Sequence, residues 1–231
     1  MKIAIFDFDG TLFRKDTLPF LGQEWLRQGK SKFTYIKTYL ACSPCLVFYK
    51  LGLWPREKMK VKILAQFHGL FKNMTREDID QFFRQAYPAM KTYFNTQVIE
   101  ELHRAQHQGY HCVILSGAYA QMLNIVAEEL GFDTVIAVEI HYKNGKVDLK
   151  KPLSVIDGKT KSVLLKRVFK DEKINWKLSR SYGDSYSDIP IMEIVGEPVA
   201  VNPDPGLEAH VEKSGWRCLW GQAPDVVQSN S

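Results

Sequence analysis

The chain has 231 residues, 45% of them apolar, and carries 31 basic and 26 acidic side chains for a formal net charge of +5. These values exclude a disordered or fibrous chain and indicate a globular protein that can bury a full core. Four cysteines in a chain of this length exclude a disulfide framework and favour reduced thiols. Met1 and Lys2 lead directly into an apolar strand without the apolar region of a signal peptide, so we expect a cytoplasmic protein.

The first predicted element is a short buried strand over residues 3–6, rich in branched and aromatic side chains. It ends at Asp7 and Asp9, which alternation along an extended backbone points to the same side. Two carboxylates this close repel each other unless a cation or a proton separates them. Gly10 then allows a sharp turn with N–H groups near an anion, and Thr11 adds a hydroxyl donor.

A helical insertion follows, because no strand signal interrupts the next stretch of chain. Four helices are expected there, opened in turn by Asp16 with Thr17, by Ser31, by Pro55 and by Thr75. The second carries apolar residues to about Trp54, and Pro44 is expected to break or kink it. We therefore expect a discontinuous α/β core of residues 1–15 and 92–231, with a small all-α cap over residues 16–91.

The rest of the chain alternates between helix and strand patterns, which is typical of a parallel sheet. The expected elements are a helix over 96–108, a strand over 111–115, a helix to 131, a strand over 134–138, a hairpin turning at Asn144-Gly145, a helix over 159–169, a strand over 179–182, a short helix, a strand over 199–201, and a last helix and strand ending near Trp220. The polar tail from Gly221 is expected to be loose. The fold class is thus α/β, a Rossmann-like parallel sheet with helices on both faces, plus the all-α cap and a β-hairpin.

Polar side chains follow several of the predicted strands directly. Asp7 and Asp9 follow the first, Ser116 follows another, and Asp184 with Asp188 follows a third. Ligands of open parallel sheets bind at the carboxyl ends of the strands, so we expect these side chains to share one crevice. Carboxylates without nearby cysteine or histidine form an all-oxygen site, which suits Mg²⁺ and a phosphate substrate.

Four ordered motifs carry a family resemblance: Asp7-Phe8-Asp9-Gly10-Thr11, Leu115-Ser116-Gly117, Lys161 near a helix start, and Gly183-Asp184-Ser185-x-x-Asp188. Together they resemble the haloacid dehalogenase superfamily, and the helical insertion resembles the cap of its phosphoserine phosphatase branch. The resemblance implies that Asp7 is the nucleophile that forms an aspartyl phosphate and that Asp9 is the acid and base. It implies a phosphatase because Asp9 is present, whereas the ion pumps of the superfamily have threonine there.

The resemblance also implies the remaining site residues. Asp184 would ligate Mg²⁺ with the Asp7 carboxylate and the backbone carbonyl of Asp9, and Asp188 would bind or orient the water shell of the metal. Four residues would stabilise the transferred phosphoryl group: the cation Lys161, Ser116 and Gly117 of the second motif, and Thr11. Lys159 stays open as the alternative to Lys161, which is preferred because Leu164 and Leu165 follow it at helical spacing.

Four positions depart from the pattern of phosphoserine phosphatases. Ala118 and Ser187 stand where those enzymes carry glycine and asparagine. Asp16 replaces the glutamate that meets the substrate amine, and Lys60 falls about where an arginine binds the substrate carboxylate. Lysine cannot reproduce the bidentate contact of arginine. We therefore expect a phosphomonoesterase acting on a small phosphorylated metabolite, with phosphoserine as one candidate among several.

The predicted cap is strongly basic, with nine Lys/Arg against one Glu over residues 25–62. Seven large aromatic residues are interleaved with these charges: Trp25, Phe33, Tyr35, Tyr39, Phe48, Tyr49 and Trp54. We favour a solvated cap whose aromatic residues form its own core. The alternative is peripheral contact with an anionic membrane, as in a lipid phosphate phosphatase similar to phosphatidylglycerophosphatase C.

Two further alternatives concern partners. No recognised binding motif accompanies the basic charge, so nucleic acid is not expected as a partner. A catalytically silent phosphate-binding protein would keep the same site without turnover. No feature of the sequence indicates an oligomeric state.

Overall fold

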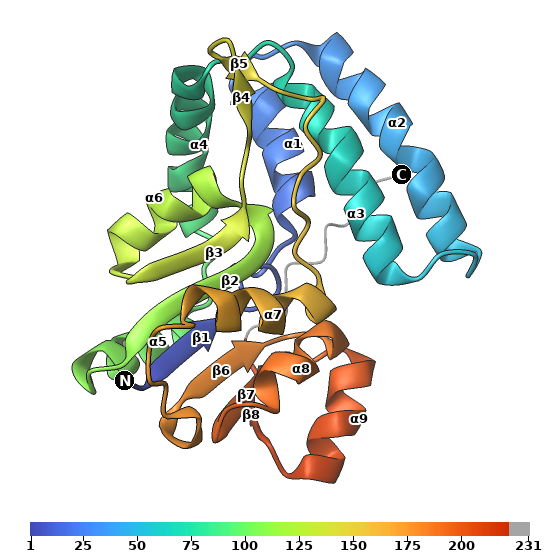
Figure 1. Ribbon diagram of the computed structural model, residues 1–231. Helices are drawn as coiled ribbons and strands as arrows, with labels where there is room; N and C mark the ends of the chain where they lie inside the picture. Colours follow the sequence, from blue (N-terminus) through green and yellow to red (C-terminus); the bar gives the residue numbers. More distant parts are fainter. Residues whose placement is uncertain (222–231) are drawn as a thin grey trace.

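The computed structural model describes residues 1–221, apart from the side chains of Glu57 and Lys159, and shows a six-stranded parallel sheet with helices on both faces (Figure 1). The strand order is β3-β2-β1-β6-β7-β8. The strands are β1 (Ile3–Phe6), β2 (His111–Tyr119), β3 (Thr134–Val138), β6 (Arg180–Gly183), β7 (Glu197–Val201) and β8 (Arg217–Leu219). The predicted α/β class is confirmed, and the tail predicted to be loose lies, beyond Gly221, outside the described residues.

Strand β1 lies at the centre of the sheet, and all four of its residues are buried. Its last residue, Phe6, pairs with Ile114 of β2 on one side and with Tyr182 of β6 on the other. The strand order reverses beside β1, so the residues that follow β1, β2 and β6 meet at one edge of the sheet. This carboxyl edge is where the candidate site forms.

Five helices belong to the α/β part of the chain and cover the sheet: α5 (Thr96–His107), α6 (Ala120–Leu130), α7 (Gly158–Val168), the short α8 (Ile189–Met192) and α9 (Pro205–Ser214). Their ends follow local signals, such as the left-handed Gly131 after α6 and the Asp157 capping box before α7. The buried Glu101 of α5 accepts hydrogen bonds from Tyr182 and Arg217 and so joins this helix to β6 and β8.

The helical insertion, defined here as α1 (Thr17–Arg27), α2 (Lys32–Lys50), α3 (Arg56–His68) and α4 (Arg76–Lys91), separates β1 from α5 in the sequence and lies beyond the carboxyl edge of the sheet (Figure 1). Pro44, which was expected to break or kink the second helix, does not break it, because α2 runs through it and ends at Lys50. A proline removes one backbone donor, and the Leu40 carbonyl that would have received it accepts the Ser43 hydroxyl at 2.9 Å instead. Within residues 1–221, no helix is both long and apolar enough to cross a membrane.

The predicted hairpin is present as β4 (Tyr142–Lys143) and β5 (Lys146–Val147), with Asn144 and Gly145 at φ 51° and 76°. It extends from the core to the helical insertion (Figure 1). The Val147 amide donates to the Met74 carbonyl at 2.9 Å, and the Arg76 guanidinium lies 4.6 Å from the centre of the Tyr142 ring. The hairpin therefore fastens the start of α4 to the α/β part of the chain.

Candidate active site

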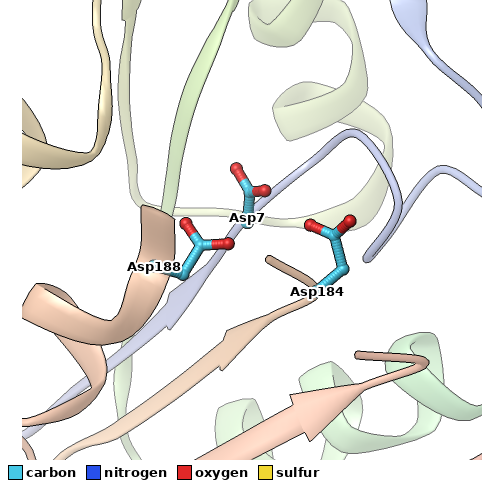
Figure 2. A group of neighbouring side chains, drawn as sticks. All are labelled: Asp7, Asp184 and Asp188. Carbon is cyan, nitrogen blue, oxygen red and sulfur yellow. The ribbon is translucent and has the colours of Figure 1, made fainter. Parts of the chain in front are cut away.

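Three carboxylates gather at the carboxyl edge of the sheet. Asp7 follows β1, Asp184 follows β6, and Asp188 lies in a short 3₁₀ helix, η3 (Tyr186–Asp188). Their side chains point toward one another (Figure 2), and one oxygen of each lies within 4.8 Å of the others. Gly10 makes this approach possible, because its φ is +83° and a Cβ there would lie 2.2 Å from Asp184 Oδ2.

Lys161, in the first turns of α7, is the cation of this cluster and is only 6% exposed. Its Nζ lies 2.8 Å from Asp7 Oδ1 and 2.6 Å from Asp188 Oδ1. Burial alone would lower the pKa of Lys161, but the two carboxylates outweigh it and hold the pKa above its usual value. The lysine is therefore charged and fixed between Asp7 and Asp188. The side chain of Lys159, the alternative, lies outside the described part of the chain.

The carboxylates of Asp188 and Asp184 differ in their partners. Asp188 Oδ2 accepts the Ser185 amide at 3.2 Å and the Ser185 hydroxyl at 3.0 Å. Burial would raise the pKa of Asp188, but Lys161 and these hydrogen bonds hold it below its usual value. No hydrogen bond or ion pair from the residues that the structure describes reaches the Asp184 carboxylate, and burial together with Asp7 and Asp188 raises its pKa well above the usual value.

The charges of this cluster fit a divalent cation. The carboxylates of the buried Asp188 and of the partly buried Asp7 and Asp184 face one ammonium group, and no described residue pairs with the Asp184 carboxylate. Burial, reinforced by the neighbouring Asp188, also raises the pKa of Asp7 despite the ion pair with Lys161. A hard cation with oxygen ligands would neutralise the excess negative charge, as Mg²⁺ does in all-oxygen sites.

Asp9 lies apart from this cluster and faces the start of α1. Its Oδ1 accepts the Thr17 amide at 3.2 Å and also the Thr17 hydroxyl. Burial and the nearby Asp16 carboxylate raise the pKa of Asp9 to about 7. A carboxyl group with that pKa can both donate and accept a proton near neutral pH.

A cavity of about 420 Å³ lies between the helical insertion and the carboxyl edge of the sheet. Seven of the predicted site residues lie on its wall: Asp7, Asp9, Asp16, Lys60, Ser116, Gly117 and Lys161. Ser116 Oγ accepts the Ala118 amide at 3.1 Å, which orients the hydroxyl. Thr11 is fully buried, and its hydroxyl is neither on this wall nor hydrogen-bonded to a described residue. Its predicted contact with the substrate has no support in this geometry.

Several residues of the site were not identified from the sequence. Ser185 holds Asp188 and Thr17 holds Asp9. The Ser185-x-x-Asp188 spacing is that of a capping box and could have indicated the first of these contacts. The rest of the cavity wall is mainly apolar and comes from segments far apart in the sequence: Leu18, Pro19, Leu46, Tyr49, Met59, Val61, Ile63, Leu64, Val155 and Ile156, with Lys50 and Arg56 as further cations.

An α/β fold with carboxylates and a buried lysine at the carboxyl edge of its sheet defines an enzyme site for an anionic substrate. The family model described as haloacid dehalogenase-like hydrolase matches residues 4–193, so the chain belongs to this family. The resemblance inferred from the four motifs is thereby confirmed.

Relatives with known names agree with this assignment. The chain is 24% identical over 213 residues to a phosphoserine phosphatase of Methanocaldococcus jannaschii, a match that covers 90% of this chain and 88% of that protein. It is 24% identical over 244 residues to a histidinol-phosphatase of Neisseria meningitidis serogroup C, covering 94% and 98%. A shorter match, 31% identical over 122 residues, to the inhibition of morphological differentiation protein of Streptomyces azureus covers 53% of this chain and 43% of that protein. The chain is a phosphatase of this family, a phosphomonoester hydrolase.

Solved structures share the fold. A protein of unknown function from Bordetella pertussis Tohama I superposes with a TM-score of 0.80 at 18% identity, covering 95% of this chain and 98% of that one. A phospho-aspartyl intermediate analogue of phosphoserine phosphatase superposes with a TM-score of 0.59 at 21% identity, covering 94% and 92%. The predicted Rossmann-like α/β architecture is therefore shared with solved structures that each match over more than nine tenths of this chain.

Proposed function

We propose that this chain is a Mg²⁺-dependent phosphomonoesterase that works through an aspartyl phosphate on Asp7. The observation that carries the proposal is the buried Lys161, which is paired with Asp7 and Asp188 beside the unpartnered carboxylate of Asp184. Asp7 and Lys161 both line the cavity, which supports a substrate contact with each of them. In this proposal residues 16–91 are a cap over a core of residues 1–15 and 92–231, and the cap closes the site and excludes water.

The first step forms a bond between an Asp7 carboxylate oxygen and phosphorus while the bond from phosphorus to the ester oxygen breaks. Lys161 and the Ser116 hydroxyl stabilise the negative charge that spreads over the phosphoryl oxygens. Asp9 gives its proton to the leaving alkoxide, which becomes an alcohol. The hydrogen bonds from Thr17 hold the Asp9 carboxyl group in position for this transfer.

The second step releases phosphate. Asp9, now ionised, takes a proton from a water molecule, the oxygen of this water bonds to phosphorus, and the bond from phosphorus to Asp7 breaks. Asp9 is thereby protonated again and Asp7 regains its carboxylate. The pKa of Asp9, about 7, suits both directions of transfer.

The proposed metal ligands are the Asp7 and Asp184 carboxylates and the backbone carbonyl of Asp9, with Asp188 orienting the water shell. Bound Mg²⁺ would neutralise phosphate charge and lower the pKa of its carboxylate ligands. The free carboxylate of Asp184 is the feature of this chain that favours such an ion.

The proposed substrate is a small phosphorylated metabolite. Asp16 and Lys60 both line the cavity, where one can meet a cationic group and the other an anionic group of the substrate. Phosphoserine and histidinol phosphate both deserve a test, since relatives are named for these activities.

A second candidate is a phosphomonoester with a larger apolar portion, such as a lipid phosphate. The observation that favours it is the apolar wall of the cavity, to which α2 contributes Leu46 and Tyr49 and α3 contributes Met59 and Leu64. Burial of an apolar group against such side chains contributes roughly 25 cal/mol per Å².

The test is phosphate release from a panel of phosphomonoesters, with Mg²⁺ and with chelator. The panel holds phosphoserine, histidinol phosphate, sugar phosphates, nucleotides and phosphatidylglycerophosphate. We expect release that chelator abolishes and that concentrates on one compound. Release that persists undiminished in chelator would contradict the metal, and no release by folded protein would contradict the proposed activity.

A further inference from the structure

The outward face of α2 is apolar and exposed. Phe33, Ile36, Leu40, Val47 and Leu51 recur at intervals of three, four and seven residues, which place them on one side of the helix. Their exposed fractions are 78%, 55%, 62%, 53% and 66%. Isolated apolar side chains are common on protein surfaces, but an aligned row of five on one helix marks an interaction surface.

This row is not the packing face of α2. The buried residues of the helix are Thr38, Cys42 and Cys45, on its opposite side. Cys42 Sγ lies 3.8 Å from the Ile63 carbonyl of α3, so this buried side is the one that packs within the protein. Figure 1 shows α2 as the outermost element on its side of the molecule, with α3 between it and the rest.

The sequence expectation that the cap aromatics form its own core is corrected by the same observation. Trp25 is 6% exposed and packs against Phe82, but Phe33, Tyr39 and Tyr49 are 78%, 59% and 40% exposed. The insertion already fills its interior with other side chains, such as Phe82 of α4, which are fully buried. Tyr35 packs against the core and Tyr49 lines the cavity, whereas Phe33 and Tyr39 are directed to something outside the described chain.

Charge identifies the kind of partner. No acidic residue occurs between Glu24 and Glu57. Lys32, Lys37 and Lys50 of α2 form no ion pair with any side chain that the structure describes, in contrast to Lys161, Arg180 and Arg217 of the α/β part of the chain. A second copy of this face would bring these lysines close to identical charges. An apolar row flanked by lysine and aromatic residues matches an anionic lipid surface, where apolar groups enter the acyl boundary and lysines meet phosphate.

The outward row is separate from the active-site cavity. Tyr49, four residues after the buried Cys45, lies on the packing side of α2 and lines the cavity, as do Leu46 and Lys50. No residue of the row lines the cavity, so docking of this face does not depend on the identity of the substrate.

From these observations we propose that the outward face of α2 docks on anionic lipid bilayers. The helix lies along the surface with the row from Phe33 to Leu51 toward the lipid, while its buried side stays packed on α3. The lysines provide attraction that weakens as salt screens it.

The experiment is flotation of the full chain with vesicles of phosphatidylcholine alone or of equal parts phosphatidylserine and phosphatidylcholine. We expect the protein to float with the anionic vesicles at low salt and to stay behind with the neutral ones. Replacing Lys32, Lys37 and Lys50 by glutamine should weaken binding by about fivefold per residue that contacts the surface. Flotation that is equal on neutral vesicles, or insensitive to salt, would contradict the charge argument.

The matched variants are Leu40→Asp/Val47→Asp on the outward face and Val168→Asp/Leu178→Asp on the α/β core, where exposures of 49% and 53% are similar. We expect the first pair to weaken vesicle binding at least about tenfold and the second to leave it unchanged. Leu40 and Val47 do not line the cavity, so release of phosphate from a water-soluble ester should persist and report correct folding.

Two outcomes would overturn the proposal. In one, folded wild-type protein never floats with anionic vesicles at low salt. In the other, sedimentation shows that the wild-type protein is a dimer without affinity for vesicles, and Leu40→Asp/Val47→Asp dissociates this dimer. That result would assign the face to a second copy of the chain. If the wild-type protein releases no phosphate in vesicle-free solution, the proposed function is contradicted. The docking proposal then stands or falls on the flotation result.

Discussion

At the carboxyl edge of the sheet Lys161 is buried and contacts two carboxylates, whereas Lys32, Lys37 and Lys50 of α2 stand in solvent without an acidic partner in the described chain. The first arrangement has more negative than positive charge and is enclosed, so it favours a bound cation. The second has only positive charge beside exposed apolar side chains. The charges of the core thus organise a reaction, and those of α2 are available to a surface outside the protein.

The largest expected effect comes from removing the nucleophile. Asp7→Asn should lower turnover at least about a thousandfold, because an amide cannot form the phosphoryl intermediate. Steady-state phosphate release measures it, with circular dichroism to show that the fold is kept. Leu40→Asp/Val47→Asp is the comparison in α2 and should retain turnover of a water-soluble ester. Appreciable release by Asp7→Asn, free of contaminating phosphatase, would refute the assignment.

The same substitution should act differently on the two groups of lysines. Lys161→Met leaves Asp7 and Asp188 buried without their cation and should lower the free energy of unfolding by about 3–5 kcal/mol. Lys37→Met, in α2, should change it by less than about 0.5 kcal/mol. Urea denaturation in chelator measures both. Equal midpoints for the two variants would show that the buried ion pairs do not stabilise the core.

The raised pKa of Asp9 predicts a pH dependence of stability. Folding raises this pKa from 3.8 to about 7, so the folded state binds more protons than the unfolded state between pH 3.8 and about 7. The contribution of Asp9 to the free energy of unfolding therefore falls as the pH rises through this range. The effect is at most about 4 kcal/mol, at roughly 1.4 kcal/mol per pH unit. Urea denaturation in chelator at several pH values measures it. Asp9→Asn should reduce the slope, while the raised pKa values of Asp7 and Asp184 keep part of it. An unchanged slope in this variant would exclude Asp9 as a source.

Metal binding should stabilise the protein through Asp184. At a hundredfold excess over the dissociation constant, Mg²⁺ should add about 2.7 kcal/mol to the free energy of unfolding. Asp184→Asn should abolish this gain and, in chelator, should be more stable than the wild type, because it removes a buried carboxylate whose ionised form is disfavoured. Thermal melting of both proteins with Mg²⁺ and in chelator tests the loss of the Mg²⁺ gain and the higher stability of the variant without metal. A variant that keeps the full Mg²⁺ shift would place the metal elsewhere.

Much of the fold could be predicted from the sequence because its signals are local. Thr75, Asn144-Gly145 and Gly131 set a helix start, a hairpin and a helix end wherever the chain is placed. Pro44 does not end α2, and the Ser43 hydroxyl satisfies the carbonyl that the proline leaves free.

The candidate site was predictable in part. Asp7 and Asp184 directly follow strands, and Ser116 lies in the last part of β2, which runs on to Tyr119 beyond the predicted end at residue 115. Parallel strands bring their carboxyl ends to one edge. Thr11 was placed in the site by its sequence position, but the tight turn after Asp9 buries it. The cavity wall depends on how α2 and α3 pack over the edge, and no local pattern encodes that arrangement.

The most direct test of the central claim is to trap the phosphoryl group on the enzyme. The wild-type chain is mixed with substrate and Mg²⁺, quenched with acid within a turnover, and its peptides are analysed by mass spectrometry. The account predicts one added phosphoryl group on the peptide that contains Asp7, and none in Asp7→Asn. Rapid phosphate release without any modified peptide, or a phosphoryl group on another residue, would contradict it.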